Sequence, residues 1–520
     1  MNSLSANRLD TEAWLSEADL WRRVAHYYGQ PGVNVWKEQI PFQITSNPCI
    51  AAAYADTLIA YLEDWVREHG ALTGKVNIVE LGAGHGLFST AMLRALAERS
   101  ASLGALPATL HYWVTDRSPN HLESWRQNPE LVEFQQSGMC GFCCFDALEN
   151  ATLPDGWQQP TQEKATPWIF IANYVFDTLP HDAFLFGDNE TKRGVVTVEQ
   201  YTPAPTLNPD TYQISLAFRS YQLTSLTPLL AAAVQGYQAL QPTGCLLIPT
   251  GALQCIEQLR QLSGDNMLLL CADKGWSRLE TAMQVQIENA IHFSNASMTV
   301  NLHAISEHVT RAGGIAFSQT TQQESLSTAA WVFGMPGNKL IATRTTFANQ
   351  LDKRSPGDLY GLAATLLTHR FNLGLAEIVS LLKLMNWDPA IFDGCFDAIL
   401  ASLSHAPLPA VADLRAALPT LAAQRYRSTH MPDTLFNIAH LQQCLGLWSD
   451  AAQHYRLSIQ ERGDTAQTWY NLGLCHAALQ ENNEAVTCFD KASALDPEML
   501  LAQGWLYRLG KTIACVAISK

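Results

Sequence analysis

The stretch from Val76 to Glu98, VNIVELGAGHGLFSTAMLRALAE, constrains the fold more than any other part of the chain. Its apolar run ends on Glu80, three glycines follow at alternate positions, Gly82, Gly84 and Gly86, and a helical pattern comes next. Glycines in a turn between a strand and a helix let a ligand approach the backbone without Cβ atoms in the way. The stretch therefore predicts a strand, a ligand-binding turn and a helix.

The glycine spacing indicates which ligand the turn holds. A dinucleotide-binding turn, G-x-G-x-x-G, would place its third glycine at position 87, where this chain has Leu87. A pyrophosphate favours helix N-terminal N–H groups with no carboxylate nearby, so Glu80 would repel it. S-adenosyl-L-methionine (AdoMet) instead carries an ammonium and a sulfonium group, which a carboxylate at the strand end attracts. We therefore predict that AdoMet is the cofactor and that Glu80 and the three glycines bind it.

Two more predicted strands end in acidic residues. LHYWVTD ends on Asp116, whose carboxylate can accept hydrogen bonds from both ribose hydroxyls. CCFDALE places Asp146 and Ala147 after the third strand, where we expect them to contact the adenine. Any one of these acids alone is more often a loop or cap residue, but three at successive strand ends favour a cofactor site.

Strand and helix patterns alternate from Val76 to about Thr346. This alternation predicts an α/β domain of the Rossmann-like class I type, with a mostly parallel, doubly wound sheet over residues 76–346. The stretch from Ala183 to Phe218 fits extended segments joined by turns, so we expect a β-rich insertion there. Residues 1–75 are predicted to form a mainly helical N-terminal cap or lid. Within it, the segment ITSNP is expected to cover the cofactor, with Ser46 as a candidate contact.

The C-terminal third is predicted to be almost wholly helical, with a helical linker over residues 347–430 and a repeat region over residues 431–520. Two segments align at a period of about 34 residues, which places Leu435 against Trp469 and Tyr455 against Phe489. This pattern resembles the tetratricopeptide repeat. We expect Leu500–Gly510 to cap the array, which serves either as a docking surface for partners or as a structural tail.

The predicted fourth strand, WIFIANYVFDTLPHDAF, ends in polar residues at the edge where the methyl donor is expected. Here we expect Asn173 to orient the methyl acceptor and Asp177 to accept its hydrogen bond or proton, with Tyr174 as a further contact. A structural alternative is that Asp177 caps the following helix.

Four segments resemble successive blocks of the MidA family of AdoMet-dependent methyltransferases: VELGAGHG, IANYVFDTLPHDAF, LLLCADKGW and SMTVNLHAISEHVTRAGG. The resemblance covers roughly residues 40–334. That family includes the mitochondrial arginine methyltransferase needed for respiratory complex I assembly, so the resemblance implies methyl transfer to a protein arginine.

One departure from the family pattern bears on the acceptor. The family's usual strand end is Asn-Glu-x-x-Asp-Ala-Leu-Pro, whereas this chain has Tyr174 in place of the glutamate and Thr178 in place of the alanine. A guanidinium must be held by carboxylates so that one nitrogen lone pair points at the methyl carbon. Either Asp177 or Asp182 substitutes for the lost carboxylate, or the acceptor is not arginine.

Composition limits the other function classes. The formal net charge of −15 argues against a surface that neutralises nucleic-acid phosphates. No apolar run approaches the ~20 residues needed to span a bilayer, and the N-terminal residues lack an export signal, so we expect a cytoplasmic protein with reduced thiols. We interpret Cys140, Cys143 and Cys144 as part of a buried strand and predict no metal site, although a metal or redox site is the alternative.

The favoured hypothesis is an AdoMet-dependent methyltransferase that modifies a protein or peptide, with the repeat helices recruiting the substrate or a partner. A small-molecule methyltransferase of a specialised pathway is the second hypothesis, and an enclosed acceptor cavity would favour it. A non-catalytic scaffold with a methyltransferase fold is the third.

Overall fold

The computed structural model describes residues 7–29, 42–72, 74–100, 110–146, 148–149, 157, 166–187, 190–200, 212–284, 291–292, 297–321, 326–427 and 431–510. The chain divides into two compact units, residues 1–360 and 361–520. Each unit is considered by itself.

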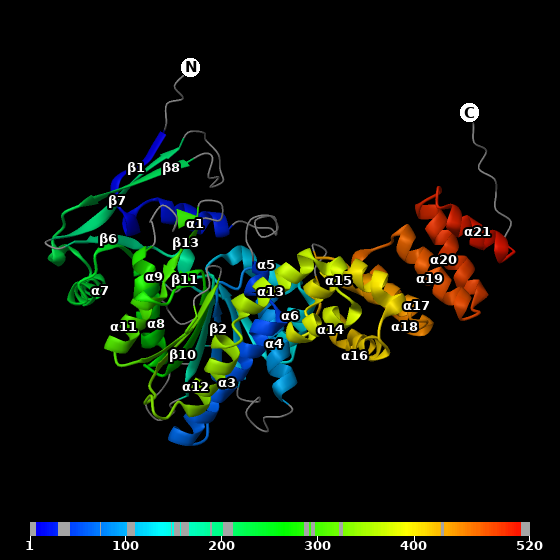
Figure 1. The fold of residues 1–520 in the computed structure, drawn as a ribbon, viewed down its shortest axis with the longest axis horizontal. Coiled ribbons are helices and arrows are strands. Elements are labelled where there is room, and N and C mark those ends of the chain that lie inside the picture. The colour runs from blue at the N-terminus through cyan, green and yellow to red at the C-terminus, as the bar shows by residue number, and fades with distance from the viewer. Residues whose placement is uncertain are drawn as a thin grey trace, which may run out of the picture. The chain divides into compact units, whose positions relative to one another are not determined.

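A seven-stranded sheet forms the centre of the first unit (Figure 1). In spatial order its strands are β15 (Ile315–Ser318), β16 (Ser327–Phe333), β10 (Met267–Asp273), β5 (Trp168–Asn173), β2 (Val76–Leu81), β3 (Leu110–Asp116) and β4 (Cys140–Cys144). The five strands from β10 to β4 are parallel, and β16 and β15 are antiparallel additions at one edge. The predicted α/β fold with a mostly parallel sheet is confirmed.

Alternate side chains of the central strands feed two apolar layers, as the period of two along a strand requires. Ile78 and Ile169 face α3 (Pro48–His69) and α4 (Leu87–Ser100). On the opposite face, Val79 and Phe170 pack against residues of α8 (Thr250–Ser263) and α11 (Leu302–Arg311). Figure 1 shows these helices on either side of the sheet. Burial on both faces explains why these strands have continuous apolar sequences.

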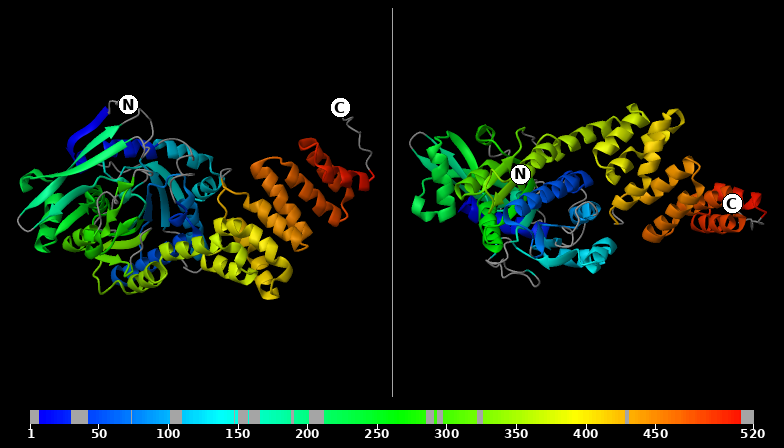
Figure 2. Two further views of the ribbon diagram at one scale, coloured as in Figure 1. Left: turned by 45° about the horizontal axis from the view of Figure 1, so that its top comes forward. Right: turned by 90° about the horizontal axis from the view of Figure 1, so that it is seen from below.

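A second, antiparallel sheet contains the predicted β-rich insertion. Its strands are β1 (Asn7–Trp14), β7 (Thr191–Gln200), β6 (Asp182–Phe186) and β9 (Gly244–Ile248), with β8 (Tyr212–Arg219) paired to β7. The prediction of a mainly helical N-terminal region was wrong for residues 7–14. These residues instead pair with β7 in antiparallel register, as the blue strand in Figure 2 shows. Local sequence could not reveal this, because the hydrogen-bonding partner lies almost two hundred residues away.

The remaining elements of the first unit are short. The helices are α1 (Leu20–Tyr28), α5 (Pro119–Gln127), α6 (Pro129–Gln136), α7 (Pro228–Ala239), α9 (Leu279–Gln284) and α12 (Ile341–Phe347). The small strand pairs are β11 (Gly275–Trp276) with β14 (Val300–Asn301) and β12 (Ile291–His292) with β13 (Ser297–Met298). Single turns are η1 (Leu15–Glu17), η2 (Phe42–Ile44), η4 (Phe176–Thr178), η6 (Leu223–Ser225) and the π-helical turn η8 (Ala348–Asp352). Helix α13 (Pro356–Thr368) begins in the first unit and ends in the second.

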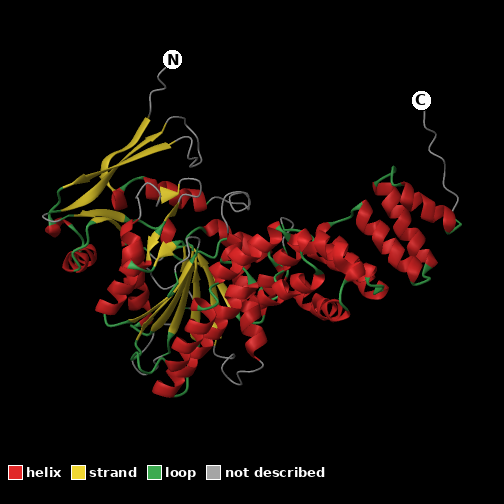
Figure 3. Ribbon diagram, in the orientation of Figure 1, coloured by secondary structure: helices red, strands yellow, loops and turns green. Residues whose placement is uncertain are grey.

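The described residues of the second unit form helices and turns, drawn red and green in Figure 3. Its helices are α14 (Leu375–Leu384), α15 (Pro389–Ser402), α16 (Leu408–Gln424), α17 (Thr434–Cys444), α18 (Trp448–Arg462), α19 (Ala466–Ala478), α20 (Asn482–Leu495) and α21 (Leu500–Arg508), with single turns η9 (Arg370–Asn372) and η10 (Leu403–His405). The pairs α17–α18 and α19–α20 are the two predicted repeats. A Cβ at Gly473 would lie 2.7 Å from the ring of Phe489, so the repeat needs glycine where these helices cross.

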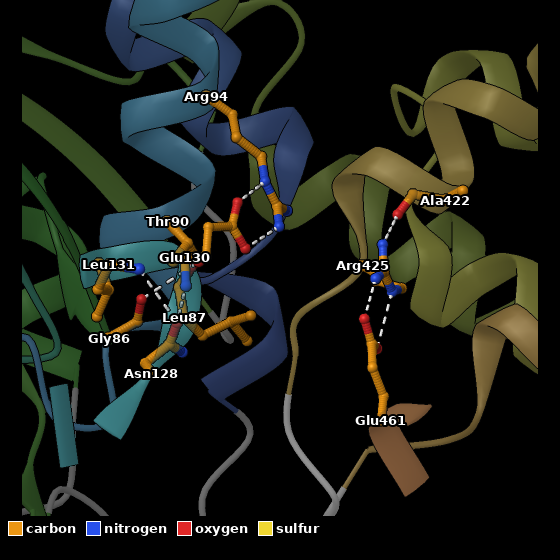
Figure 4. A network of polar contacts seen from close by, with 10 residues as sticks. All are labelled: Gly86, Leu87, Thr90, Arg94, Asn128, Glu130, Leu131, Ala422, Arg425 and Glu461. Carbon is orange, nitrogen blue, oxygen red and sulfur yellow. Dashed lines mark hydrogen bonds and ion pairs between the residues drawn. The ribbon is translucent and has the colours of Figure 1, made fainter. Parts of the chain in front are cut away.

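Polar contacts join the repeats to the helices before them. Arg425, just after α16, donates to the carboxylate of Glu461 on α18 and to the carbonyl of Ala422 (Figure 4). Asp393 on α15 accepts hydrogen bonds from Thr434 at 2.7 Å and from Asn437 at 2.9 Å. Among the described residues, no helix combines the length and apolarity needed to cross a membrane.

Candidate active site

The turn between β2 and α4 has the backbone conformation that its glycines predict. The φ angles of Gly82, Gly84 and Gly86 are 63°, 54° and 84°. These values lie in the left-handed region, which residues other than glycine rarely adopt. A Cβ at Gly86 would also lie 2.8 Å from Leu131 Cδ1 and 3.2 Å from Trp125 Cδ1. Both the backbone conformation and the packing of neighbouring side chains therefore require glycine at position 86.

Side chains from the next strand and helix hold this turn in place. Asp116, the last residue of β3, accepts the N–H of Gly84 at 3.1 Å and that of Ser118 at 2.9 Å. Trp125 on α5 is fully buried and donates its indole N–H to the Gly84 carbonyl at 2.8 Å. His121 Nδ1 lies 3.1 Å from the Asp116 carboxylate. Sequence reasoning missed Trp125 and His121, because both lie inside a helix and no strand-end pattern marks them.

Helix α4, which follows the turn, is tied to α6 (Figure 4). Arg94 on α4 forms a two-pronged ion pair with Glu130, and both side chains are largely buried. Asn128 caps α6 by accepting the N–H groups of Glu130 and Leu131 at 3.0 and 3.1 Å. These contacts fix Leu131, and with it the wall against which Gly86 packs.

Glu80 lies under the turn. It is buried, and its Oε2 accepts hydrogen bonds from Ser89 on α4 and from Tyr112 on β3. Burial raises the pKa of Glu80 to about 7, while the two hydroxyl donors favour the charged form and oppose the rise. The carboxyl group therefore changes charge near neutral pH, and its hydroxyl partners couple β2, β3 and α4.

The other predicted cofactor residues lie on loops. Asp146, two residues after β4, is half-buried and accepts the N–H of Leu148 at 2.9 Å. Ala147 lies outside the described residues. Ser46 is half-buried in the turn before α3. Its neighbour Thr45 meets the end of β5, where its carbonyl accepts the side-chain amide of Asn173 at 3.4 Å.

Asn173 ends β5 and is held from several elements. Its Oδ1 accepts the hydroxyl of Tyr54 on α3 at 2.9 Å and the N–H of Ala272 on β10 at 3.2 Å. Tyr174 follows with φ at 51°, an unusual value for a tyrosine, and donates its N–H to the Ala272 carbonyl at 3.0 Å. The turn after β5 is therefore strained locally and held by hydrogen bonds from β10.

Asp177 lies in η4 beside a second buried carboxyl group, Asp273, at the end of β10. Asp273 Oδ2 accepts the N–H groups of Phe176 at 2.9 Å and Asp177 at 3.3 Å, and its Oδ1 accepts that of Lys274 at 2.8 Å. Burial raises the pKa of Asp177 to about 7, opposed by Lys274 and Ser297. The pKa of Asp273 is raised well above its usual range, mainly by burial and in addition by the nearby charge of Asp177. Sequence analysis missed Asp273, although it carries the same signal as Glu80 and Asp116, an acid that ends an apolar strand.

Asp182 does not lie free to replace a lost carboxylate. It is fully buried, pairs with Arg193 on β7 at 3.0 Å and accepts the Thr250 hydroxyl at 3.0 Å. Arg193 also reaches Ser16 and stacks over the ring of Trp14, 4.7 Å from its centroid. The alternative in which Asp182 holds the substrate guanidinium is therefore wrong, because this carboxylate already neutralises the buried guanidinium of Arg193.

The glycine turn adjoins the turn after β5, residues 174–178. A Cβ at Gly82 would lie 3.1 Å from Val175 Cγ2, in the segment between Tyr174 and Asp177. The carboxyl ends of β2, β3 and β5 thus form one site, at the edge where open α/β sheets bind ligands.

The residues present fit AdoMet. The glycine turn leaves its backbone open at Gly82, which is exposed, and Asp116 ends the neighbouring strand beside it. Glu80, predicted to contact the cofactor, is instead buried under the turn and bonded to Ser89 and Tyr112. Gly82, Gly84, Asp116 and Asp146 are the residues that would hold the cofactor there. No cluster of metal-ligand type occurs within the described residues. Burial raises the pKa of the Cys140 and Cys143 thiols to about 12. The prediction that these cysteines belong to a buried strand was wrong for Cys144, which is exposed.

Comparison with known proteins gives the same class. Residues 57–291 match a protein family described as "Putative S-adenosyl-L-methionine-dependent methyltransferase", and residues 466–499 match the tetratricopeptide repeat. A "likely methyl transferase" from Burkholderia thailandensis, bound to S-adenosyl-homocysteine, is 13% identical over 63% of this chain and 89% of that chain, with a TM-score of 0.40. Magnesium protoporphyrin IX methyltransferase from Synechocystis PCC 6803, with AdoMet bound, is 10% identical over 60% of this chain and 97% of its own, with a TM-score of 0.28. No curated protein matches the chain significantly.

The family match confirms the cofactor and the enzyme class that the glycine turn predicts. The repeat match confirms the second of the two predicted repeats. With its glycine turn and acidic strand ends inside the matched region, this chain is an S-adenosyl-L-methionine-dependent methyltransferase that carries a tetratricopeptide repeat.

Proposed function

We propose that this enzyme methylates a nitrogen of a protein or peptide side chain, with arginine as the first candidate, in the manner of the MidA family that its sequence resembles. The observation that carries this proposal is the buried carboxyl group of Asp177 in the turn that follows Asn173, a turn that adjoins the glycine turn at Val175. Asp177 Oδ1 is buried without a hydrogen-bond partner among the described residues. A buried, unpaired acceptor at this place favours an incoming N–H donor.

The side chains of Asp177 and Asn173 would have different roles in the reaction. AdoMet, when bound, supplies a methyl group on a positively charged sulfur, which keeps the electrons of the broken bond. The acceptor nitrogen gives up one proton for the methyl group that it gains. Asp177 would take this proton, because a pKa of about 7 lets a carboxylate act as a base near neutral pH. Asn173, fixed by Tyr54 and Ala272, would orient the acceptor.

Tyr174 stands where the family's usual glutamate would add a second carboxylate. Burial raises the pKa of its phenol, with Asp177 and Asp273 adding to the rise, so Tyr174 stays neutral. A neutral phenol can accept a hydrogen bond from a guanidinium or stack against it, although it does not offset its charge. Asp177 would then be the carboxylate that faces the cation.

The repeat helices support a macromolecular substrate. Tetratricopeptide arrays present curved surfaces that bind proteins or peptides. We propose that α17 to α20 recruit the substrate or a partner protein, while the first unit carries out the chemistry.

Transfer of a tritium-labelled methyl group from AdoMet tests this proposal. The purified full chain is incubated with a peptide rich in arginine and glycine, and with a matched peptide in which lysine replaces every arginine. We expect label in the arginine peptide and its loss in Asp177→Ala, with the affinity for S-adenosylhomocysteine, measured by calorimetry, unchanged.

The outcomes separate the alternatives. Label in the lysine peptide alone would keep a protein nitrogen as acceptor and exclude arginine. Binding of AdoMet without labelling of either peptide or of any protein in a cell extract would favour a small-molecule acceptor. A folded chain that binds neither AdoMet nor S-adenosylhomocysteine would contradict the proposal as a whole.

A further inference from the structure

Asp273 holds the turn that carries the proposed catalytic groups. Its carboxylate ends β10 and is fully buried, and the N–H groups of Phe176 and Asp177 both point at its Oδ2. The backbone of Ala272, one residue earlier, bonds to Asn173 and Tyr174. The end of β10 therefore fixes the turn after β5 along its whole length.

This turn needs such support. Tyr174 has a φ of 51°, a conformation that is strained for a residue with a Cβ and persists only where the surroundings impose it. The register between β5 and β10 pairs Asn173 with Ala272, which places Asp273 just beyond the last strand pair. Without acceptors at Asp273, the N–H groups of Phe176 and Asp177 would be buried without partners.

Several charged or titratable groups surround Asp177. Asp273, Lys274 and Cys271 come from β10 and the residue after it, Tyr174 from the same turn, and Tyr54 from α3 lies close to Asp273. Lys274 is half-buried and attracts the charged form of Asp177. Two carboxyl groups buried together disfavour full ionisation, because each negative charge raises the energy of the other.

We propose that Asp273 is a positioning residue for methyl transfer: its carboxyl group fixes the turn that presents Asp177. This inference rests on the proposed role of Asp177. It also makes a prediction about Asp177 that needs no methyl acceptor, so that the two can fail separately.

The acceptor-free experiment is a titration of the full chain labelled with carbon-13 at the aspartate carboxyl carbons. The resonance that disappears in Asp177→Asn reports Asp177. We expect its midpoint near pH 7 in the wild type and a downward shift of about one pH unit or more in Asp273→Asn, because an amide cannot accept all three N–H groups, so that the turn loosens and Asp177 becomes less buried. An unchanged midpoint would overturn the inference, because Asp177 would then keep its buried position without Asp273.

The catalytic experiment uses the arginine–glycine peptide as probe. Asp273→Asn should lower kcat about 100-fold through misplacement of Asp177, while KM for the peptide and the Kd for AdoMet stay within about twofold. Asp273→Glu keeps the carboxyl group but displaces it by one methylene, so the turn should move and both kcat and the Asp177 midpoint should fall. Asp273→Glu also tests the positioning role of Asp273 if Asp273→Asn does not fold.

Asp265→Asn serves as the matched control. Asp265 lies just before the same strand, is exposed and pairs with Arg260, so neither kcat nor the Asp177 midpoint should move. A wild-type kcat in both Asp273 variants would refute a positioning role. If the wild type fails to label the peptide, the proposed acceptor is wrong, and the carboxyl titration alone then judges Asp273.

Discussion

Gly86 illustrates how a single residue serves the cofactor turn. Its φ of 84° lies in the left-handed region, and Leu131 and Trp125 occupy the space that a Cβ would need. Gly313 has almost the same φ, 85°, with nothing within 4 Å of a Cβ. The two glycines thus share the backbone requirement and differ in the packing around them.

We expect Gly86→Ala to weaken AdoMet binding more than tenfold, because the turn must move away from Leu131 and Trp125. Gly84→Val should abolish binding, since a β-branched side chain is strained at a φ of 54°. Gly313→Ala is the control and should lose only the backbone term, about 1–2 kcal/mol of stability, without loss of affinity. Calorimetric titration with AdoMet measures all three, and unchanged affinity in Gly84→Val would mean that another loop binds the cofactor.

Glu80 gives the first unit a pH-dependent stability. Because its folded pKa is raised to about 7 from 4.5, the folded state disfavours the charged form. The resulting penalty is absent below pH 4.5, grows as pH rises through the window from 4.5 to 7, and reaches about 3 kcal/mol above it.

Glu80→Gln should therefore be more stable than the wild type at pH 8 and nearly equal to it at pH 5. Its side-chain oxygen can still accept from Ser89 and Tyr112. Thermal unfolding at the two pH values tests this, with the transition of the first unit identified by its shift on adding S-adenosylhomocysteine. Equal differences at both pH values would show that Glu80 is charged throughout this range.

At the scale of elements, α3 connects the apolar core to Asn173 at the end of β5. Tyr54 and Tyr61 lie two turns apart on this helix, and both are fully buried. The hydroxyl of Tyr54 bonds to Asn173 at 2.9 Å, whereas that of Tyr61 has no hydrogen-bond partner among the described residues. Tyr61 is therefore a control for Tyr54 on the same helix, because it is equally buried but its hydroxyl makes no such hydrogen bond.

Tyr54→Phe should cost about 1 kcal/mol of stability and lower the methyl-transfer rate, because Asn173 loses one of the groups that orient it. Tyr61→Phe should be neutral or stabilising, since it removes a buried hydroxyl that pairs with nothing. Chemical unfolding and methyl-transfer assays on both variants provide the comparison. Equal losses in the two would mean that the Asn173 contact does not matter for the reaction.

At the scale of the whole molecule, the candidate active site and the repeat helices belong to different units. Every residue of the candidate active site lies before position 361, and the repeat helices lie after it. The second unit has its own apolar core, which includes Ala451, Leu472, Ala485 and Phe489.

Deletion of residues 431–520 should leave AdoMet affinity within about twofold of the wild type and reduce methylation of the natural protein substrate at least tenfold. A short peptide acceptor should be methylated equally well by both forms, since it does not need the repeats. Calorimetry and label transfer measure the two effects. Full activity of the shortened chain on the natural protein would show that the repeats do not recruit it.

Much of the fold was predictable because its signals are local. The strands β2, β3, β4, β5 and β10 follow from short apolar runs, and the cofactor turn follows from glycines at alternate positions. The repeats follow from their period. The N-terminal strand β1 was mispredicted because its partner lies far along the chain. Asp273 has a local signal, an acid that ends an apolar strand, but its contact with the backbone of Asp177 depends on the strand order of the sheet.

The sequence by itself determined the cofactor class, since a glycine turn and an acid at a strand end specify backbone conformation and charge within a few residues. Only the tertiary structure decided which side chains surround the acceptor. Asp273 reaches Asp177, Tyr54 reaches Asn173, and Asp182 is taken by Arg193, each because strand order and helix packing bring distant residues together. Such pairings depend on the sum of many weak, non-local contacts, which no short stretch of sequence contains.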